Sequence, residues 1–309
     1  NISGCFLFIW FVKPFAVLIQ NISPKGPEIE AISRQIANAH TVFNITMTLI
    51  WVCLIKLMVK IVMTLIPDGK KGVEDPGSPI YLDENIISQP AAALQLVAKE
   101  ILHLSDQVKK VLHDTVTVVK ENQMQGVDKI QEESAKVTKL TDKITDYLAG
   151  LFSSGLLTEQ QASQTAGLMY VLGDVERIGN LSAGIALSMK EKETNQYKYS
   201  QEAMDELAKC LKTLEKMFDS ATKALRGDTT VELEKLMKRK DKIVNLDIMM
   251  RKSHIQRVNK GKCKASLTTP FTNILHLIDR MGNSCINLAD AATNEVALKY
   301  FLPKDEMTM

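Results

Sequence analysis

The 309-residue sequence is poor in the features that mark several large classes of protein. Nine prolines and fifteen glycines are too few for a fibrous chain, and 45% hydrophobic residues are too many for a disordered one. The net charge is only +2, from 38 basic and 36 acidic residues, so no one-sided basic balance indicates a nucleic-acid partner. We therefore expect a folded protein that binds no nucleic acid.

Cysteine and histidine are also scarce and scattered. The five cysteines form no CxxC pair, and an odd number fits no complete disulfide framework, so reduced thiols are expected. The five histidines show neither HxxxH nor HExxH spacing, which argues against a zinc site on a single helix. GxSxG, P-loop and GxGxxG motifs are missing as well, so the sequence predicts a protein that is not an enzyme.

Long apolar runs, by contrast, are present near the start. The first, at about residues 2–20, contains a single charge at Lys13. About twenty apolar residues are enough to cross a bilayer as a helix, so this run predicts a first span. The Lys13-Pro14 step counts against a simple lipid-facing helix, because proline removes a backbone hydrogen bond and lysine is costly inside a bilayer. A signal peptide is the alternative, although no basic start or clear cleavage site is present.

A second run covers residues 36–66 and would be roughly 46 Å long as a helix. Because the hydrocarbon core of a bilayer is about 30 Å thick, we expect a span at about 36–55 with an amphipathic extension to residue 66. Lys56 and Lys60 mark the interface, and the positive-inside rule places the rest of the chain in the cytoplasm. The prediction is a multi-pass plasma-membrane protein with residues 1–66 in the lipid bilayer.

Strong helical periodicity follows in residues 86–309, after a linker at 67–85 that is rich in proline and glycine. Pro90 and capping boxes that begin at Thr158 and Thr229 mark helix starts, and no alternating strand-type run of useful length appears. We therefore predict an all-α domain. The clearest apolar stripe, with intervals of three and four, comprises Leu94, Val97, Ile101, Leu104, Val108, Val111, Thr115 and Val118.

An internal duplication divides this domain. The segment ERIGN at 176–180 recurs 103 residues later as DRMGN at 279–283, and the preceding helices match at an offset of 106 residues. Two copies of a three-helix unit, at about 86–190 and 195–300, predict a six-helix bundle. The matching apolar positions are Val137, Leu140 and Ile144 in the first copy and Ile243, Leu246 and Met250 in the second.

Each copy of the motif offers an acid and an amide four residues apart, Glu176 with Asn180 and Asp279 with Asn283. Their oxygens form a candidate site for a hard divalent metal. An amide oxygen brings no charge to the metal, and no His or Cys joins the group, so polar contacts between helices are the favoured alternative. Capping and salt bridges to the neighbouring arginines are further alternatives. The glycine within each motif has no side chain and lets another helix approach closely.

His40 and Asn44 lie four residues apart on one face near the start of the second span. Polar groups at such a depth normally face protein or a water-filled path. The favoured alternative is a hydrogen bond between membrane helices. The spacing therefore predicts a shared polar face and leaves the substrate-binding residues unknown.

Residues 34–44 have the pattern R-x-x-A-x-A-H-x-x-F-N, which resembles a signature in the last part of the membrane core of bacterial sodium/phosphate cotransporters. The ERIGN and DRMGN motifs resemble those of PhoU-like domains, and that family carries such a domain after its membrane core. This resemblance implies sodium-dependent phosphate symport by the intact protein, with sodium ion and phosphate as transported species. The helical domain would be a cytoplasmic regulatory module, and His40 and Asn44 are carried over as signature positions.

The sequence departs from the family in two ways. The Gln-Ser-Ser-Ser motifs of the transport site are missing, so we interpret the chain, which starts at Asn1 within an apolar run, as the C-terminal portion of a symporter without its upstream core. Metal-binding PhoU-like proteins use acid-x-x-x-Asp motifs, whereas Asn180 and Asn283 replace the second acid here. The alternative is a membrane-anchored PhoU-like interaction or signalling protein without transport, whose partner is a second copy or a cytoplasmic regulatory protein.

Overall fold

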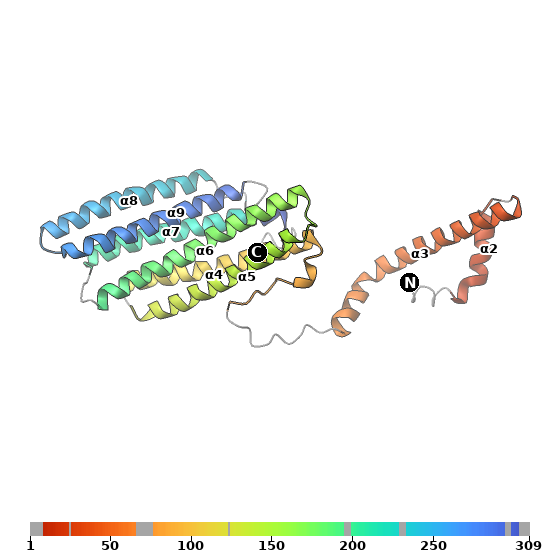
Figure 1. Ribbon diagram of the computed structural model, residues 1–309, viewed down its shortest axis with the longest axis horizontal. Helices are drawn as coiled ribbons and strands as arrows, with labels where there is room; N and C mark the ends of the chain where they lie inside the picture. Colours follow the sequence, from red (N-terminus) through yellow and green to blue (C-terminus); the bar gives the residue numbers. More distant parts are fainter. Residues whose placement is uncertain are drawn as a thin grey trace. The chain divides into compact units, whose positions relative to one another are not determined.

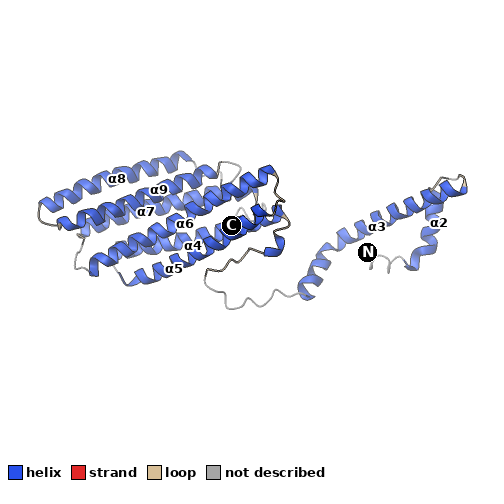
Figure 2. Cartoon of the chain, viewed as in Figure 1, coloured by secondary structure: helices blue, strands red, loops and turns tan. Residues whose placement is uncertain are grey.

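The computed structural model divides the chain into two compact units, Asn1–Glu74 and Asp75–Met309. Within the ranges that the structure describes, all regular secondary structure is helical (Figure 2). The prediction of an all-α protein is therefore confirmed. The described residues are 9–24, 26–65, 77–122, 124–194, 199–228, 233–293 and 298–302.

The N-terminal unit contains a short helical turn, η1 (Ile9–Phe11), and two helices, α2 (Val12–Ile22) and α3 (Glu28–Leu65). Pro14 lies in the first turn of α2, where its missing N–H is not needed, so the helix tolerates it. The Asn38 side chain of α3 donates a hydrogen bond to Ser23 Oγ at the end of α2 (3.0 Å). The two helices therefore contact each other near the short connection that joins them.

The prediction of two membrane spans is not met in the described part of this unit. Only Glu30–Val62 of α3 is long and apolar enough to cross a membrane, by length and composition. The apolar helical stretch Ile9–Ile22 is shorter than a span, and residues 1–8 of the predicted first span lie outside the described residues. One candidate span therefore replaces the two that the sequence predicted.

The helix α3 also begins earlier than the sequence predicted. The Ala31 backbone N–H bonds to the Pro27 carbonyl (3.0 Å), and the acidic Glu30 lies in the first turn. Acidic side chains there complement the positive end of the helix dipole and so favour a helix start. A polar first turn thus precedes the apolar part of α3 in one continuous helix.

Within its described residues, the second unit is a bundle of six long helices (Figure 1). Four of them, α4, α6, α7 and α9, contact one another along the middle, because α4 packs on α6 and α7 while α9 packs on the same two helices. The remaining two lie outside: α5 covers α4 and α6, and α8 covers α7 and α9. The bounds are α4 (Pro90–Glu121), α5 (Val127–Ser153), α6 (Glu159–Thr194), α7 (Gln201–Arg226), α8 (Leu233–Asn259) and α9 (Thr268–Ala291).

The two halves of this bundle have the same order of three helices. The outer helices α5 and α8 have the same length, 27 residues, and their bounds differ by 106 positions throughout. The matched apolar residues point into the core in both copies, and the predicted stripe on α4 is buried along its whole length. One continuous hydrophobic core joins all six helices, so the two repeats form a single packed unit.

Several helix ends agree with the local sequence signals. Pro90 occupies the first position of α4, and the capping box before α6 is formed by two reciprocal bonds, Thr158 N to Gln161 Oε1 (3.0 Å) and Gln161 N to Thr158 Oγ1 (3.2 Å). Gly227 ends α7 with a φ of 99°, a left-handed conformation that glycine adopts without strain. The second predicted capping box, at Thr229, lies outside the described residues.

Candidate functional site

In the first repeat, the predicted motif residues form a small hydrogen-bond network on the surface between α5 and α6. Asn180 Oδ1 accepts hydrogen bonds from Ser134 Oγ (2.9 Å) and Thr138 Oγ1 (3.2 Å), both on α5. Asn180 Nδ2 donates to Glu176 Oε1 (3.1 Å) one turn earlier on α6. The amide thus joins the two helices, and the acid orients the amide.

In the second repeat, a lysine takes the place of these hydroxyl groups. Lys240 Nζ, on α8, donates to Asp279 Oδ1 (2.5 Å) and to the Asp279 carbonyl (2.9 Å) on α9. At the offset of 106 residues, Lys240 corresponds to Ser134, so equivalent positions of the two outer helices make different polar contacts with the motif helix. The Asn283 amide points to Asp279 Oδ2 at a long 3.5 Å. An ammonium–carboxylate pair therefore holds α8 against α9.

The motif glycines permit the close approach that the sequence predicted. A Cβ atom on Gly179 would lie 3.2 Å from Val108 Cγ2 of α4 and 3.4 Å from Val137 Cγ1 of α5, so three helices converge there. A Cβ atom on Gly282 would meet the Lys240 chain instead, at 3.2 Å from both Cδ and Nζ. The first glycine makes room for rigid core residues and the second for a flexible side chain.

These contacts bear on the predicted metal site at Glu176, Asn180, Asp279 and Asn283. Among the residues that the structure describes, no three His, Cys, Asp or Glu side chains lie close enough together to hold a metal ion. The Lys240 ammonium already neutralises Asp279, and the amide oxygen of Asn180 already accepts two hydroxyl hydrogens. A divalent metal would have to displace these partners, and metal binding by the four residues stays a prediction.

A further polar contact joins the two repeats, and the sequence reasoning missed it. Asp174 of α6 accepts hydrogen bonds from Ser284 Oγ (2.7 Å) and Asn287 Nδ2 (3.1 Å) of α9. Its counterpart in the second repeat is Leu277, which packs near Gly184 on α6. The duplicated motif could not reveal Asp174, because only one of the two equivalent positions is polar.

The signature residues of the N-terminal unit lie on the exposed surface of α3. Asn44 Nδ2 lies 3.2 Å from His40 Nδ1, so the two side chains bond along one face of the helix. Both residues are exposed, and α2 and α3 are the only helices described in this unit. The pairing agrees with the predicted shared face, and the two residues remain signature positions without an assigned ligand.

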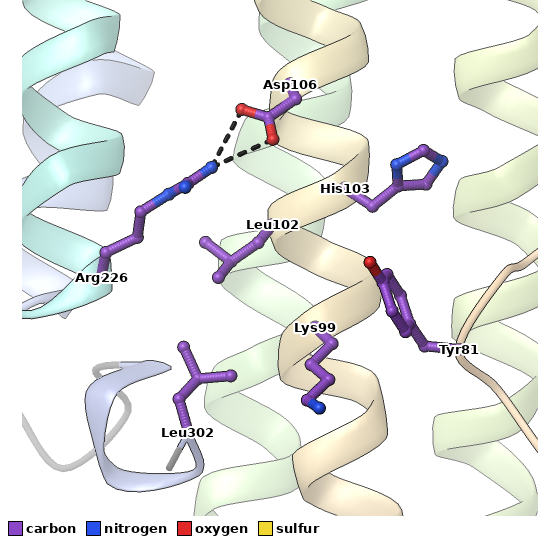
Figure 3. A pocket seen from close by; sticks show the side chains of 7 residues that line it. All are labelled: Tyr81, Lys99, Leu102, His103, Asp106, Arg226 and Leu302. Atoms are coloured by element: carbon purple, nitrogen blue, oxygen red, sulfur yellow. Dashed lines mark hydrogen bonds and ion pairs between the residues drawn. The ribbon is translucent and has the colours of Figure 1, made fainter. Parts of the chain in front are cut away.

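The outer face of α4 carries a groove of about 340 Å³ (Figure 3). Arg226, at the end of α7, reaches over one side and donates from Nη2 to both Asp106 carboxylate oxygens (2.9 and 3.0 Å). On the other side of α4, Tyr81 meets His103 edge to face at 6.4 Å. The groove is lined by Tyr81, Lys99, Leu102, His103, Asp106, Arg226 and Leu302.

A buried carboxylate fixes one wall of this groove. Glu100 is fully buried on α4, and its Oε2 accepts the backbone N–H groups of Ile80 (2.9 Å) and Tyr81 (2.6 Å). Charge-assisted bonds of this kind hold an irregular segment firmly against a helix. The groove combines segments more than 200 residues apart in sequence, so no local motif could have predicted it.

A second buried polar group lies between α8 and α9. His254 is almost fully buried, stacks on Phe271 with ring centroids 4.8 Å apart, and bonds through Nε2 to Thr268 Oγ1 (3.1 Å). Burial lowers the pKa of His254, and the nearby Arg257 cation lowers it further. The ring is therefore kept neutral at neutral pH, as part of the packing.

Arg257 extends this buried group toward α7. Its side chain is 5% exposed and donates from Nη1 to Ser253 Oγ (2.6 Å) and Glu206 Oε2 (3.1 Å). Within the described part of the chain, its Nε and Nη2 atoms have no partner. In the first repeat the positions equivalent to His254 and Arg257 are two buried leucines, so this group is peculiar to the second repeat.

Comparison with known proteins agrees with the duplicated architecture. A family model described as PhoU domain matches the sequence twice, at residues 101–189 and 207–292. The first match covers α5 and most of α4 and α6, and the second covers α8, α9 and most of α7, so each match spans one repeat. Together they account for more than half of the chain. No curated protein matches the sequence.

Proposed function

The chain belongs to the PhoU domain family, and on this premise we propose that it is a membrane-anchored regulator of phosphate uptake. PhoU domains are regulatory and generally non-enzymatic. The bundle would act by binding a partner, and α3 would hold it at the membrane. The family match to both repeats is the observation that carries this proposal.

The exposed apolar surface of α3 supports the anchoring role. Only 6% of its most apolar stretch is buried within the molecule, whereas the core helix of a soluble protein would be mostly buried. Side chains such as Ile45, Leu49 and Val52 are each more than half exposed. Exposed apolar surface of this size is typical of a site that contacts a partner or a membrane, and a lipid bilayer would remove it from water.

The groove on α4 is the candidate surface for a regulatory partner. It presents Lys99, His103 and the Arg226–Asp106 pair beside apolar Leu102, which is the mixed character of a protein-binding site. The α4–α7 contact that frames it also joins the two repeats. A partner bound there would therefore contact both halves of the bundle.

Phosphate uptake by cells of the source organism tests the proposal. Removing residues 77–309 while keeping residues 1–65 should uncouple uptake of radiolabelled phosphate from the external phosphate concentration. A His103→Glu, Arg226→Glu variant should produce a partial loss of the same response, and Lys120→Glu, at the exposed end of α4, should not. A normal response after removal of the bundle would refute the regulatory role.

The pattern at residues 34–44 favours a second candidate, the C-terminal portion of a sodium-dependent phosphate symporter. Under this hypothesis the source DNA upstream of the Asn1 codon encodes further spans and two Gln-Ser-Ser-Ser motifs. The chain by itself should give no sodium-dependent phosphate uptake in reconstituted vesicles, because it has no such motif. Uptake by the longer product, lost on His40→Ala or Asn44→Ala, would support this candidate over a simple anchor.

A further inference from the structure

The outer helix α8 exposes an unusual amount of apolar surface. Six of its large apolar side chains are exposed, against two on α6, one on α5 and none on the described parts of α4, α7 and α9. Ile248 is 59% exposed and Ile255 is 56% exposed. Because helix positions three, four or seven apart share a face, most of this surface forms one stripe. The stripe comprises Leu233, Met237, Val244, Ile248 and Ile255.

The equivalent surface of α5 shows that the bundle does not need this stripe. At the offset of 106 residues, Gln131, Thr138 and Asp142 stand where Met237, Val244 and Ile248 stand on α8. The two helices have the same length and the same place in their repeats. Gln131 and Thr138 bond to α6, whereas Asp142 is exposed, so packing does not require the apolar side chain of Ile248 and a partner outside the bundle is indicated there.

The charge of α8 separates it from α5 as well. Eight basic and three acidic residues give α8 a net charge of +5, whereas four basic and five acidic residues give α5 a net charge of −1. Lys238, Lys242 and Lys252 are exposed on α8, as are the acidic Glu234 and Asp241, and Lys238 pairs with Glu234 (2.7 Å). Three more lysines, at positions 260, 262 and 264, follow directly after the helix. The exposed side of α8 thus combines an apolar stripe with an excess of basic over acidic residues.

We propose that this side of α8 docks on an anionic lipid surface. A helix with an apolar stripe next to a basic strip lies in the interface of a membrane, where the lysines contact acidic headgroups. A second copy of the chain is a poorer occupant, because two helices of charge +5 repel each other. The stripe also has none of the aromatic residues that dominate protein–protein contacts.

If α3 is anchored in a bilayer, the linker keeps the bundle close to that bilayer. The inference therefore rests on the proposed anchoring by α3. Eleven residues separate Leu65 from Gly77, a span of at most about 40 Å. Tethering raises the effective concentration of α8 at the lipid surface, so weak docking becomes effective. Docking would hold the bundle against the headgroups and make its position depend on the content of acidic lipid.

Tryptophan fluorescence of the full chain tests the docking. Both tryptophans, Trp10 and Trp51, belong to the N-terminal unit, so a tryptophan placed on α8 reports alone once these two are phenylalanine. The Ile248→Trp variant is reconstituted in phosphatidylcholine vesicles with or without phosphatidylglycerol, using lipids brominated on the acyl chains. We expect at least a twofold quenching in the phosphatidylglycerol vesicles and little in phosphatidylcholine alone.

The matched control is Asp142→Trp, at the equivalent position of α5, which should remain unquenched in both kinds of vesicle. Adding Lys238→Glu, Lys242→Glu and Lys252→Glu to Ile248→Trp should abolish most of the quenching, as should high salt. Equal quenching at both positions, or none at position 248 in phosphatidylglycerol vesicles, would overturn the docking. A blue-shifted emission that brominated lipid does not quench would also overturn it, because protein would then cover the stripe.

The unmodified chain separates this inference from the anchoring on which it rests. Quenching of Trp10 and Trp51 in either kind of vesicle reports insertion of the N-terminal unit, independently of α8. Quenching of these two without quenching at position 248 would overturn the docking and leave the anchor intact. Absence of both signals would overturn the anchor and the docking together.

Discussion

The two repeats of the bundle have the same order of helices, but their outer helices, α5 and α8, differ in surface residues, buried residues and polar contacts. In the first repeat, α5 is joined to α6 through a neutral network of Ser134, Thr138 and Asn180. In the second, α8 is joined to α9 through the Lys240–Asp279 ion pair. Leu148 and Leu151 near the end of α5 are replaced on α8 by a buried histidine and a buried arginine.

The comparison shows which features the fold requires. The apolar positions that match between α5 and α8 are kept, because they fill the one core shared by all six helices. The polar contact beside each motif glycine can be neutral or ionic, since either kind provides hydrogen-bond partners for the polar side chains between the two helices. The exposed surfaces of α5 and α8 differ most, because the surface of α8 is basic and partly apolar. The following predictions, each measured by urea unfolding of a fragment of residues 77–309, address these differences in order of decreasing size.

The largest difference should come from equivalent core leucines. Leu140 is fully buried on α5, whereas Leu246, its counterpart on α8, is only partly buried. Leu140→Ala should therefore cost about 3 kcal/mol of unfolding free energy, and Leu246→Ala about 1 kcal/mol, because a less buried site leaves a smaller cavity. Equal losses would mean that α8 packs as tightly as α5.

Alanine at the two motif glycines should give the next largest contrast. In Gly179→Ala the new methyl group meets the buried valines of α4 and α5, and we expect a loss of about 1–2 kcal/mol. In Gly282→Ala the Lys240 chain can move aside, so the higher helix propensity of alanine should leave stability unchanged within about 0.5 kcal/mol. A larger loss at Gly282 than at Gly179 would contradict this contrast.

The two polar contacts should differ in their response to salt. Lys240→Met removes an ion pair whose carboxylate is 46% exposed, and we expect a loss of about 1 kcal/mol that shrinks at high salt. Ser134→Ala removes one of two hydroxyl donors to Asn180 and should cost about 0.5 kcal/mol at any salt concentration. If salt leaves the effect of Lys240→Met unchanged, the pair acts mainly through the packing of its alkyl chain.

The smallest effect should be a pH dependence peculiar to the second repeat. Burial and Arg257 lower the pKa of His254, so below pH 6.5 the unfolded chain binds a proton that the folded chain does not. Stability should thus be constant above this pH and fall as the pH decreases toward the lowered pKa. His254→Leu copies Leu148 of the first repeat and should flatten this part of the profile. An unchanged slope would assign the loss to other groups.

Much of the fold could be predicted because its signals are local. Apolar residues spaced three and four positions apart indicated α4, and the capping box at Thr158 indicated the start of α6. Gly227 ends α7 in the left-handed conformation that is typical of a glycine at a helix end. The early start of α3 was missed, because hydropathy marks the apolar part of a helix and ignores the polar turn at Glu28. A span was also predicted at about residues 2–20, because that run is apolar, but its described helical stretch, Ile9–Ile22, is shorter than a membrane span.

The candidate sites were predictable only as far as they repeat. The motif placed Glu176 with Asn180, and Asp279 with Asn283, on their helices, and these pairs are in contact. Their partners on α5 and α8 lie about 40 residues away in sequence, so no spacing rule could find them. Asp174 escaped notice for a different reason, because its counterpart in the second repeat is apolar.

The sequence by itself determined the helices, the duplication and the apolar character of α3, because periodicity, capping and composition act over a few turns of one helix. Only the tertiary structure decided that Lys240 pairs with Asp279, that the groove on α4 unites four distant segments, and that one stripe of α8 is left exposed. These features depend on which helix faces are brought together. That choice follows from the burial of the shared core, to which all six helices contribute.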